Sequence, residues 1–169
     1  MNTVRKLLIC CGLLLVPLLF GGYFAARGEK GSDTDSICSP ASPQSICNAR
    51  TTCGSRSTPC VVNVKRGGHS ASATPSIPEA KGNAPFCVKA GTTITWQSSS
   101  KSTGFILDFG EKTPFESQTT ITGGSKRPVS VVVKRPGCFR FSVSACREAA
   151  VYGMCESGSA ELVVIADEN

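Results

Sequence analysis

Cysteine is the residue type with the clearest chemical consequence in this 169-residue chain. Eight cysteines follow residue 26, and no two of them have the C-x2-C spacing that is typical of zinc sites and thioredoxin-like redox motifs. An even number in a chain that carries an export signal predicts four disulfides, formed among Cys38, Cys47, Cys53, Cys60, Cys87, Cys138, Cys146 and Cys155. Proximity along the chain favours pairing Cys146 with Cys155, and the first four cysteines among themselves.

The other residues capable of catalysis lack the partners that catalysis requires. The single histidine, His69, lies in a polar stretch with no Gly-x-Ser-x-Gly motif in the chain, so we expect an exposed loop residue. The segment Gly123–Lys126 lacks the G-x4-G-K-[ST] spacing of a phosphate-binding loop and favours a hairpin turn. Asp108, Glu111 and Glu116 are interpreted as exposed carboxylates. We therefore expect no catalytic residues, no cofactor and no enzymatic activity.

The N-terminal segment predicts export from the cytoplasm. Residues 7–26 are uncharged and follow a short basic stretch, and a helix of this length spans roughly 30 Å, enough to cross a bilayer. Residues 23–26 lack a good small-x-small cleavage site, which favours a signal anchor over a cleaved signal peptide. Arg5 and Lys6 favour a cytoplasmic N-terminus. We expect a membrane-anchored protein whose C-terminal domain is periplasmic or extracellular, with a secreted protein as the alternative.

Composition divides the rest of the chain into a linker and one domain. Residues 27–59 are rich in Ser, Gly, Pro and Thr and predict a cysteine-containing linker, whereas residues 60–166 predict the folded domain. The formal net charge is +6, but the basic residues occur in pairs and form no run of five like charges. We therefore expect no nucleic-acid partner.

Short runs of Val, Ile, Thr and Phe predict an all-β domain with almost no helix. Phe105, Leu107 and Phe109 alternate with polar residues, as do Phe139, Phe141 and Val143, and Trp96 is the one indole available for the core. Residues 67–85 and 147–158 are expected to be loops. The expected strands cover residues 61–65, 86–89, 92–97, 104–109, 117–121, 129–134, 138–144 and 160–165.

Three stretches of the domain resemble the cupredoxin-like fold. They are Val88-Lys89-Ala90-Gly91-Thr92-Thr93-Ile94-Thr95-Trp96, Phe105-Ile106-Leu107-Asp108-Phe109 and Gly137-Cys138-Phe139-Arg140-Phe141, followed by a closing strand at residues 160–164. The first stretch is also similar to a strand of immunoglobulin-like sandwiches. Either resemblance implies an antiparallel Greek-key β-sandwich, preceded here by the N-terminal hydrophobic helix.

The resemblance does not extend to the copper site of blue copper proteins, which hold the metal with two His, one Cys and a weak axial Met. Phe105 stands where the resemblance implies the first His. Cys146 and Met154 could imitate two ligands, but no His lies between them. We therefore expect no metal site, with Cys146 and Met154 as a weak alternative and a disulfide as the main role of Cys146.

Two functional hypotheses follow from these observations. The first is a non-catalytic, membrane-anchored interaction module, with an unidentified protein or small-molecule ligand, that uses loops 67–85 and 147–158 as its contact surface. The second is a degenerate cupredoxin that keeps a residual metal-binding or redox role through Cys146 and Met154. Four disulfides without a free thiol would favour the first hypothesis.

Overall fold

The computed structural model describes residues 37–38, 43–100, 103–147 and 155–167, all of which belong to one compact unit spanning Ser32–Asn169. The expected hydrophobic helix at residues 7–26 lies outside the described residues. Within the described part of the chain, no helix is long and apolar enough to cross a membrane.

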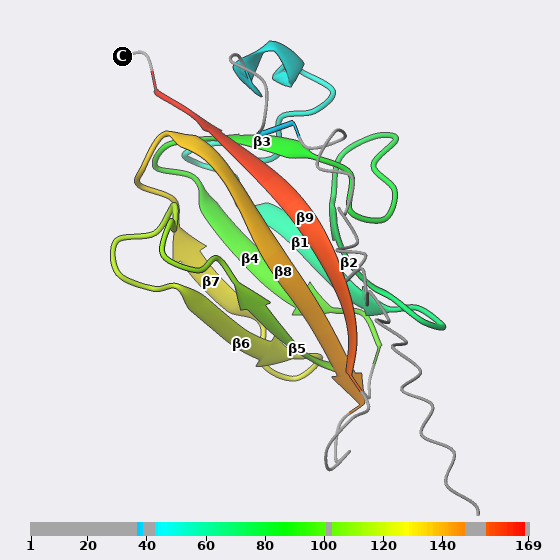
Figure 1. The fold of residues 1–169 in the computed structure, drawn as a ribbon. Coiled ribbons are helices and arrows are strands. Elements are labelled where there is room, and N and C mark those ends of the chain that lie inside the picture. The colour runs from blue at the N-terminus through cyan, green and yellow to red at the C-terminus, as the bar shows by residue number, and fades with distance from the viewer. Residues whose placement is uncertain (1–36, 39–42, 101–102, 148–154, 168–169) are drawn as a thin grey trace, which may run out of the picture. The chain divides into compact units, whose positions relative to one another are not determined.

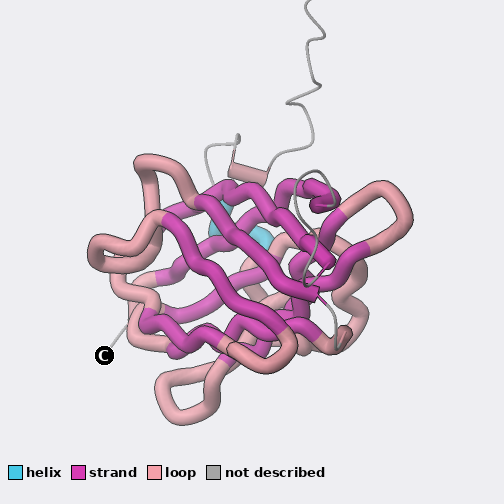
Figure 2. Tube along the Cα trace, turned by 90° about the horizontal axis from the view of Figure 1, so that it is seen from below, coloured by secondary structure: helices cyan, strands magenta, loops and turns pink. Residues whose placement is uncertain are grey.

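The described residues form nine strands and one short 3-10 helix, arranged as two sheets (Figure 1). One sheet has the strand order β2-β1-β4-β7 and the other has the order β3-β9-β8-β5-β6. Figure 2 shows the strands gathered in the centre with loops around the rim. The elements are η2 (Pro43–Ile46), β1 (Cys60–Arg66), β2 (Ala71–Pro75), β3 (Phe86–Lys89), β4 (Thr93–Ser98), β5 (Thr103–Asp108), β6 (Thr120–Gly124), β7 (Val129–Val132), β8 (Gly137–Arg147) and β9 (Cys155–Ile165).

The expected β-sandwich is confirmed, but the purely antiparallel pairing is wrong because each sheet contains one parallel pair. Strand β1 runs parallel to β4, with Cys60 opposite Ile94, and β3 runs parallel to β9, with Phe86 opposite Leu162. A parallel pair needs a long connection between its strands. Between β1 and β4 the connection contains β2, the loop after it, and β3 in the opposite sheet, so the chain returns to β4 in the direction of β1.

The core forms where the inward faces of the two sheets meet, as the alternating pattern predicts. Phe105, Leu107, Phe141 and Val143 are almost fully buried from one sheet, and Trp96 is fully buried from the other. The Trp96 ring packs edge-on against Phe141 with centroids 5.6 Å apart. Edge-to-face contacts of this kind add to the stabilisation that burial of the apolar area supplies.

Several expected boundaries change because small residues also form strands here. Strand β2 lies inside the expected loop 67–85, where Ala71 and Ala73 are buried and alternate with Ser72 and Thr74. Strands β8 and β9 extend into the expected loop 147–158 and remain paired as far as Cys146 opposite Cys155. Strand β6 begins at Thr120, not at residue 117, and includes Gly123 and Gly124. The hairpin turn expected from Gly123 therefore begins one residue later, at Gly124, which exchanges backbone hydrogen bonds with Arg127.

Residues 43–59, expected to belong to a linker, are part of the domain. The Cys53 amide donates to the Cys87 carbonyl over 2.8 Å, and the Cys87 amide donates to the Thr51 carbonyl over 2.9 Å. Cys53 is 2% exposed, and an isolated parallel bridge joins Thr52 to Cys87. The segment therefore covers the outer edge of β3, and its polar composition concealed this role.

All eight outer cysteines form disulfides, which confirms the expected number. The pairs are Cys38–Cys138, Cys47–Cys87, Cys53–Cys60 and Cys146–Cys155. The predicted pairing of the last two cysteines is confirmed, but the pairing of the first four among themselves is wrong for Cys38 and Cys47. Cys38 pairs with a cysteine of β8 that lies 100 residues away in the sequence, and Cys47 pairs with a cysteine of β3 that lies 40 residues away. Both pairings are possible because the segment before β1 lies against these strands.

Candidate functional site

The residues considered as a weak alternative metal site do not form a copper-binding set. Phe105 is 1% exposed and fills the core, and its neighbour Gly104 pairs with Cys146 on β8. The Cys146 sulfur is bonded to Cys155, so no thiolate is available to a metal. His69 is exposed in the turn between β1 and β2, and Met154 lies outside the described residues. Among the described residues, no three His, Cys, Asp or Glu side chains form a cluster that could hold a metal ion.

The three carboxylates singled out from the sequence are exposed, as expected. Asp108 accepts a hydrogen bond from the Gly110 amide over 3.0 Å and so stabilises the turn after β5. Glu116 forms an ion pair with Lys134 at 2.6 Å. These contacts give both side chains structural roles.

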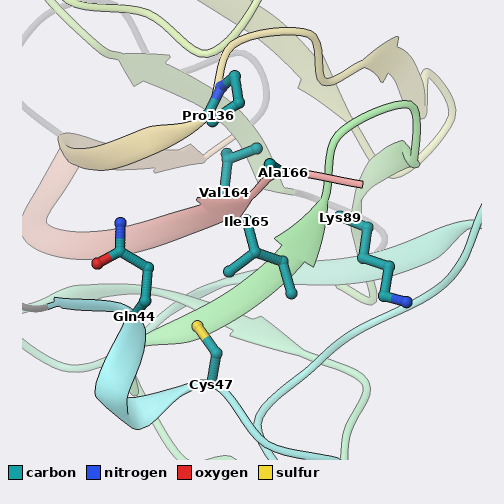
Figure 3. A pocket seen from close by; sticks show the side chains of 7 residues that line it. All are labelled: Gln44, Cys47, Lys89, Pro136, Val164, Ile165 and Ala166. Atoms are coloured by element: carbon teal, nitrogen blue, oxygen red, sulfur yellow. The ribbon is translucent and has the colours of Figure 1, made fainter. Parts of the chain in front are cut away.

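A concave surface lies at the C-terminal end of β9. A hollow of about 500 Å³ lies between η2, the end of β3 and the end of β9 (Figure 3). Its apolar part comes mainly from Val164, Ile165 and Pro136, whereas Gln44 and Lys89 supply polar groups. Such a combination of apolar surface with a few polar groups is typical of binding sites.

A second hollow adjoins the first, and a third adjoins the second. The second hollow, of about 540 Å³, shares Pro136 and Ala166 with the first, and also contacts Arg56 and Asp167. The third, of about 250 Å³, shares Val132 and Lys134 with the second and lies beside β7. We call the surface formed by these three adjoining hollows the end groove.

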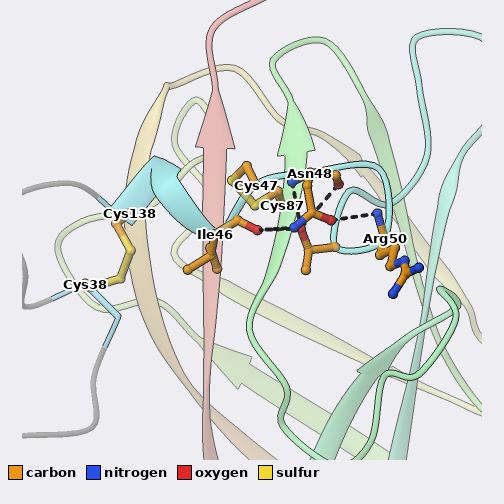
Figure 4. The surroundings of a disulfide bond; sticks show 8 residues. Cys38, Ile46, Cys47, Asn48, Arg50, Cys87 and Cys138 are labelled. Atoms are coloured by element: carbon orange, nitrogen blue, oxygen red, sulfur yellow. Dashed lines mark hydrogen bonds between the residues drawn. A yellow bond between two sulfur atoms is a disulfide. The ribbon is translucent and has the colours of Figure 1, made fainter.

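The wall of the end groove near η2 is held by a disulfide and a compact turn (Figure 4). Cys47, which lines the first hollow, is bonded to Cys87 on β3. The Thr51 hydroxyl donates to the Ile46 carbonyl over 2.6 Å, and the Arg50 amide donates to the Asn48 side chain over 2.8 Å. These bonds fix the turn that follows η2, so this wall is built before any ligand arrives.

The rim of the end groove carries more positive than negative charge. Its carboxylates Asp167 and Glu116 are each engaged in an ion pair, with Arg56 and Lys134 respectively. Lys89 adds an exposed ammonium group. The hydrogen bond from Lys134, and then its positive charge, lower the pKa of Glu116 from its ordinary value. Glu116 therefore stays ionised at neutral pH, and its negative charge is balanced by the positive charge of Lys134. Arg56 and Asp167 balance each other in the same way, so Lys89 leaves the rim with a net positive charge.

Arg135 increases the positive charge beside the groove. It follows Lys134 directly, and its guanidinium donates to the Glu116 backbone carbonyl over 2.8 Å. A carbonyl carries no net charge, so this hydrogen bond positions Arg135 without neutralising it.

Comparisons with known proteins give limited information on the chain. No protein-family model matches it, and no curated protein matches it significantly. A solved structure of an oxidised single-site mutant of amicyanin is similar, with a TM-score of 0.36 and 12% identity over 68% of this chain and 93% of that chain.

The sequence did not identify the end groove, because its residues come from the ends of strands that are far apart in the chain. The expected contact loops 67–85 and 147–158 instead contribute β2 and the ends of β8 and β9. One signal was present in the sequence: the Lys134-Arg135-Pro136 triplet ends an apolar strand and brings two cations to one edge of the groove.

Proposed function

We propose that this protein is a non-catalytic extracytoplasmic interaction module that binds its partner in the end groove. The observation that carries the proposal is the continuity of three hollows with an apolar floor and a cationic rim. A surface of this kind can bind a ligand through burial of apolar area while its charges orient the ligand. Nothing in this function requires a reaction or a cofactor.

The disulfides support a location outside the cytoplasm. Structural disulfides form and persist in oxidising compartments and are rare in the cytosol. Four of them in one small domain therefore indicate an oxidising, extracytoplasmic environment. We further propose that residues 7–26 anchor the protein in the membrane, with the domain on the outer side, while a secreted form is the alternative.

The alternative function, a degenerate cupredoxin with a metal or redox role, has less support. It depended on the sulfur of Cys146, which is instead joined to Cys155 across the paired ends of β8 and β9. The four disulfides account for all cysteines after residue 26, so the outer part of the chain has no free thiol for such a role.

Site-specific photo-crosslinking in the cells that make the protein tests the proposed function. A photoreactive amino acid replaces Lys89 at the groove rim or Ser142, an exposed residue on the outer face of β8, in the full-length chain. We expect a discrete crosslinked product at Lys89 and none at Ser142, since only the former contacts the partner.

A second substitution makes the test specific to the groove. Ala166→Trp fills the junction of the first two hollows, and it should abolish the crosslink at Lys89 without removing any disulfide. Equal crosslinking at Lys89 and Ser142, or a product that survives Ala166→Trp, would show that the end groove is not the contact surface.

A further inference from the structure

The outer edges of strands β2 and β3 are covered by other parts of the chain. The Asn83 side chain accepts from the Ala73 amide over 2.8 Å and donates to the Ala71 carbonyl over 3.1 Å, so it occupies the outer edge of β2. The segment before β1 covers the outer edge of β3, as described above. Covered edges cannot pair with a strand from another molecule.

Strand β7 differs because its outer edge is open over its middle. The Val133 amide donates to the Thr92 carbonyl over 3.0 Å, and its carbonyl accepts from Gly91 over 2.7 Å, so Val133 faces β4. Alternation along a strand then directs the backbone groups of Ser130 and Val132 away from β4. Strand β7 is the last strand of its sheet and pairs with β4 alone among the described strands.

The third hollow of the end groove lies along this open edge. It is lined by Val131 and Val132 on one side and by residues 115–118 on the other. Val132 is 45% exposed, a large fraction for an apolar side chain in a strand. An extended segment beside β7 would bury this side chain and satisfy the outward backbone groups at the same time.

Basic residues stand at both ends of β7. Lys126-Arg127-Pro128 precedes the strand and Lys134-Arg135-Pro136 follows it, and one of these four cations, Lys134, forms an ion pair with Glu116. If two copies of the chain paired antiparallel through β7 about Val131, Arg127 of one copy would lie opposite Arg135 of the other. Like charges directly opposite each other are destabilising, so these residues oppose self-association and favour an acidic partner.

We propose that β7 accepts an extended acidic segment of a protein partner as an added strand. The partner's backbone pairs with Ser130 and Val132, while carboxylates at the two ends of its segment meet the basic residues at the two ends of β7. This inference rests on the proposed function, since it names the class of partner for the β7 side of the end groove.

The test measures binding of a fluorescent peptide to the full-length protein in detergent by anisotropy. The probe is Glu-Glu-Thr-Val-Thr-Val-Glu-Glu, and its controls are the same peptide with Lys in place of Glu and a version methylated on alternate backbone nitrogens. We expect only the unmodified acidic peptide to bind. Raising the ionic strength from about 0.01 M to about 0.15 M, which shortens the Debye length from about 30 Å to about 8 Å, should weaken binding.

Two pairs of variants separate the backbone from the charges. Ser130→Pro removes an outward amide without breaking a backbone hydrogen bond to β4 and should weaken binding at least about fivefold. Ser130→Ala keeps the amide and should bind normally, and both variants lose the side-chain hydrogen bond between Ser130 and Thr95. Reversing Lys126 and Arg127 to Glu should weaken binding about tenfold. Reversal of a single cation away from β7, Lys65 on the exposed side of β1, controls for charge reversal as such and should have no effect.

The outcomes distinguish this inference from the proposed function. If the acidic peptide fails to bind, binds equally well when methylated, or binds Ser130→Pro normally, strand addition at β7 is wrong, even where crosslinking at Lys89 succeeds. A concentration-dependent dimer that Ser130→Pro abolishes would identify a second copy as the occupant and would also overturn the inference. Thermal unfolding of Ser130→Pro that matches Ser130→Ala, which loses the same side-chain bond to Thr95, ensures that the variant reports on binding.

Discussion

Removal of the Cys47–Cys87 disulfide should destabilise the domain strongly, by an amount that grows with the logarithm of the length of the loop that it closes. The bond joins residues that are 40 apart, and the chain-entropy relation gives a loss of about 3.9 kcal/mol for a loop of that size. The Cys146–Cys155 bond closes a loop of only 9 residues, for which the same relation gives about 2.6 kcal/mol. The double alanine variants should therefore differ by about 1.3 kcal/mol.

Urea unfolding under non-reducing conditions measures both losses. Each variant is purified in oxidised form, and its remaining three disulfides are verified by peptide mapping before unfolding is followed by the fluorescence of Trp96, the one tryptophan of the chain. Because Trp96 is fully buried, its emission reports on the core directly. Alanine is chosen because Cys87 is fully buried and a serine hydroxyl there would add a desolvation cost.

The reasoning fails if the order of the two losses is reversed. A smaller loss for Cys47–Cys87 than for Cys146–Cys155 would mean that the segment containing η2 is attached only loosely to β3. It would then be unsuited to form a wall of the end groove. The same variants also report on function, since loss of the Cys47–Cys87 bond should weaken crosslinking at Lys89, whereas loss of Cys146–Cys155 should leave it unchanged.

Three further predictions concern packing, charge and metal binding. Gly158→Ala would place its new Cβ 2.1 Å from a backbone carbonyl of β2 and should lower the free energy of unfolding by about 1–3 kcal/mol, whereas Gly68→Ala, with nothing within 4 Å, should be nearly neutral in the same urea assay. The pKa of Glu116 is lowered in the folded state, so the ion pair makes a small contribution to the free energy of unfolding. This contribution is present above the pKa of Glu116 in the unfolded state, and it disappears as the pH falls through the pKa of Glu116 in the folded state. The unfolding midpoints of Glu116→Gln and the parent should therefore converge in acid, and a gap that widens in acid would contradict the ion pair. Cu²⁺ added to the oxidised protein, with Cys10 and Cys11 replaced by Ala, should give no thiolate charge-transfer band, because the sulfur of Cys146 is held in a disulfide; such a band would revive the cupredoxin hypothesis.

Sequence reasoning succeeded where burial depends on local alternation. Phe105 and Leu107 are buried because every second side chain of a strand faces the same side of the sheet. This alternation can be recognised in the amino-acid sequence alone. It failed at β2, where the buried positions are Ala71 and Ala73. Alanine is not enriched in strands, and nothing local to β2 shows that β9 approaches it closely, with Gly158 against the Ala71 carbonyl. A contact between residues so distant in the chain leaves no local pattern.

The same limit explains the disulfides and the end groove. Pairing by proximity was right for Cys146 and Cys155, because β8 and β9 form one hairpin. It was wrong for Cys38, whose partner Cys138 lies 100 residues away on a strand that the N-terminal segment crosses. The groove arises from the ends of β3, β7 and β9 and from η2, which the fold brings together at one end of the sandwich.

The positions of the disulfides provide an independent argument for a role of the end groove. Cys138 follows the groove residue Pro136 by two positions, and Cys87 precedes Lys89 by two.

The third bond, Cys53–Cys60, closes the short loop that holds Arg56, another groove residue. Three of the four disulfides thus fix residues of one surface, although stability alone would be served as well by bonds elsewhere. A surface held in place before binding loses less conformational entropy when its partner arrives, and more of the interaction energy then appears as affinity. The surface of the proposed contact is therefore held in place by three of the four disulfides.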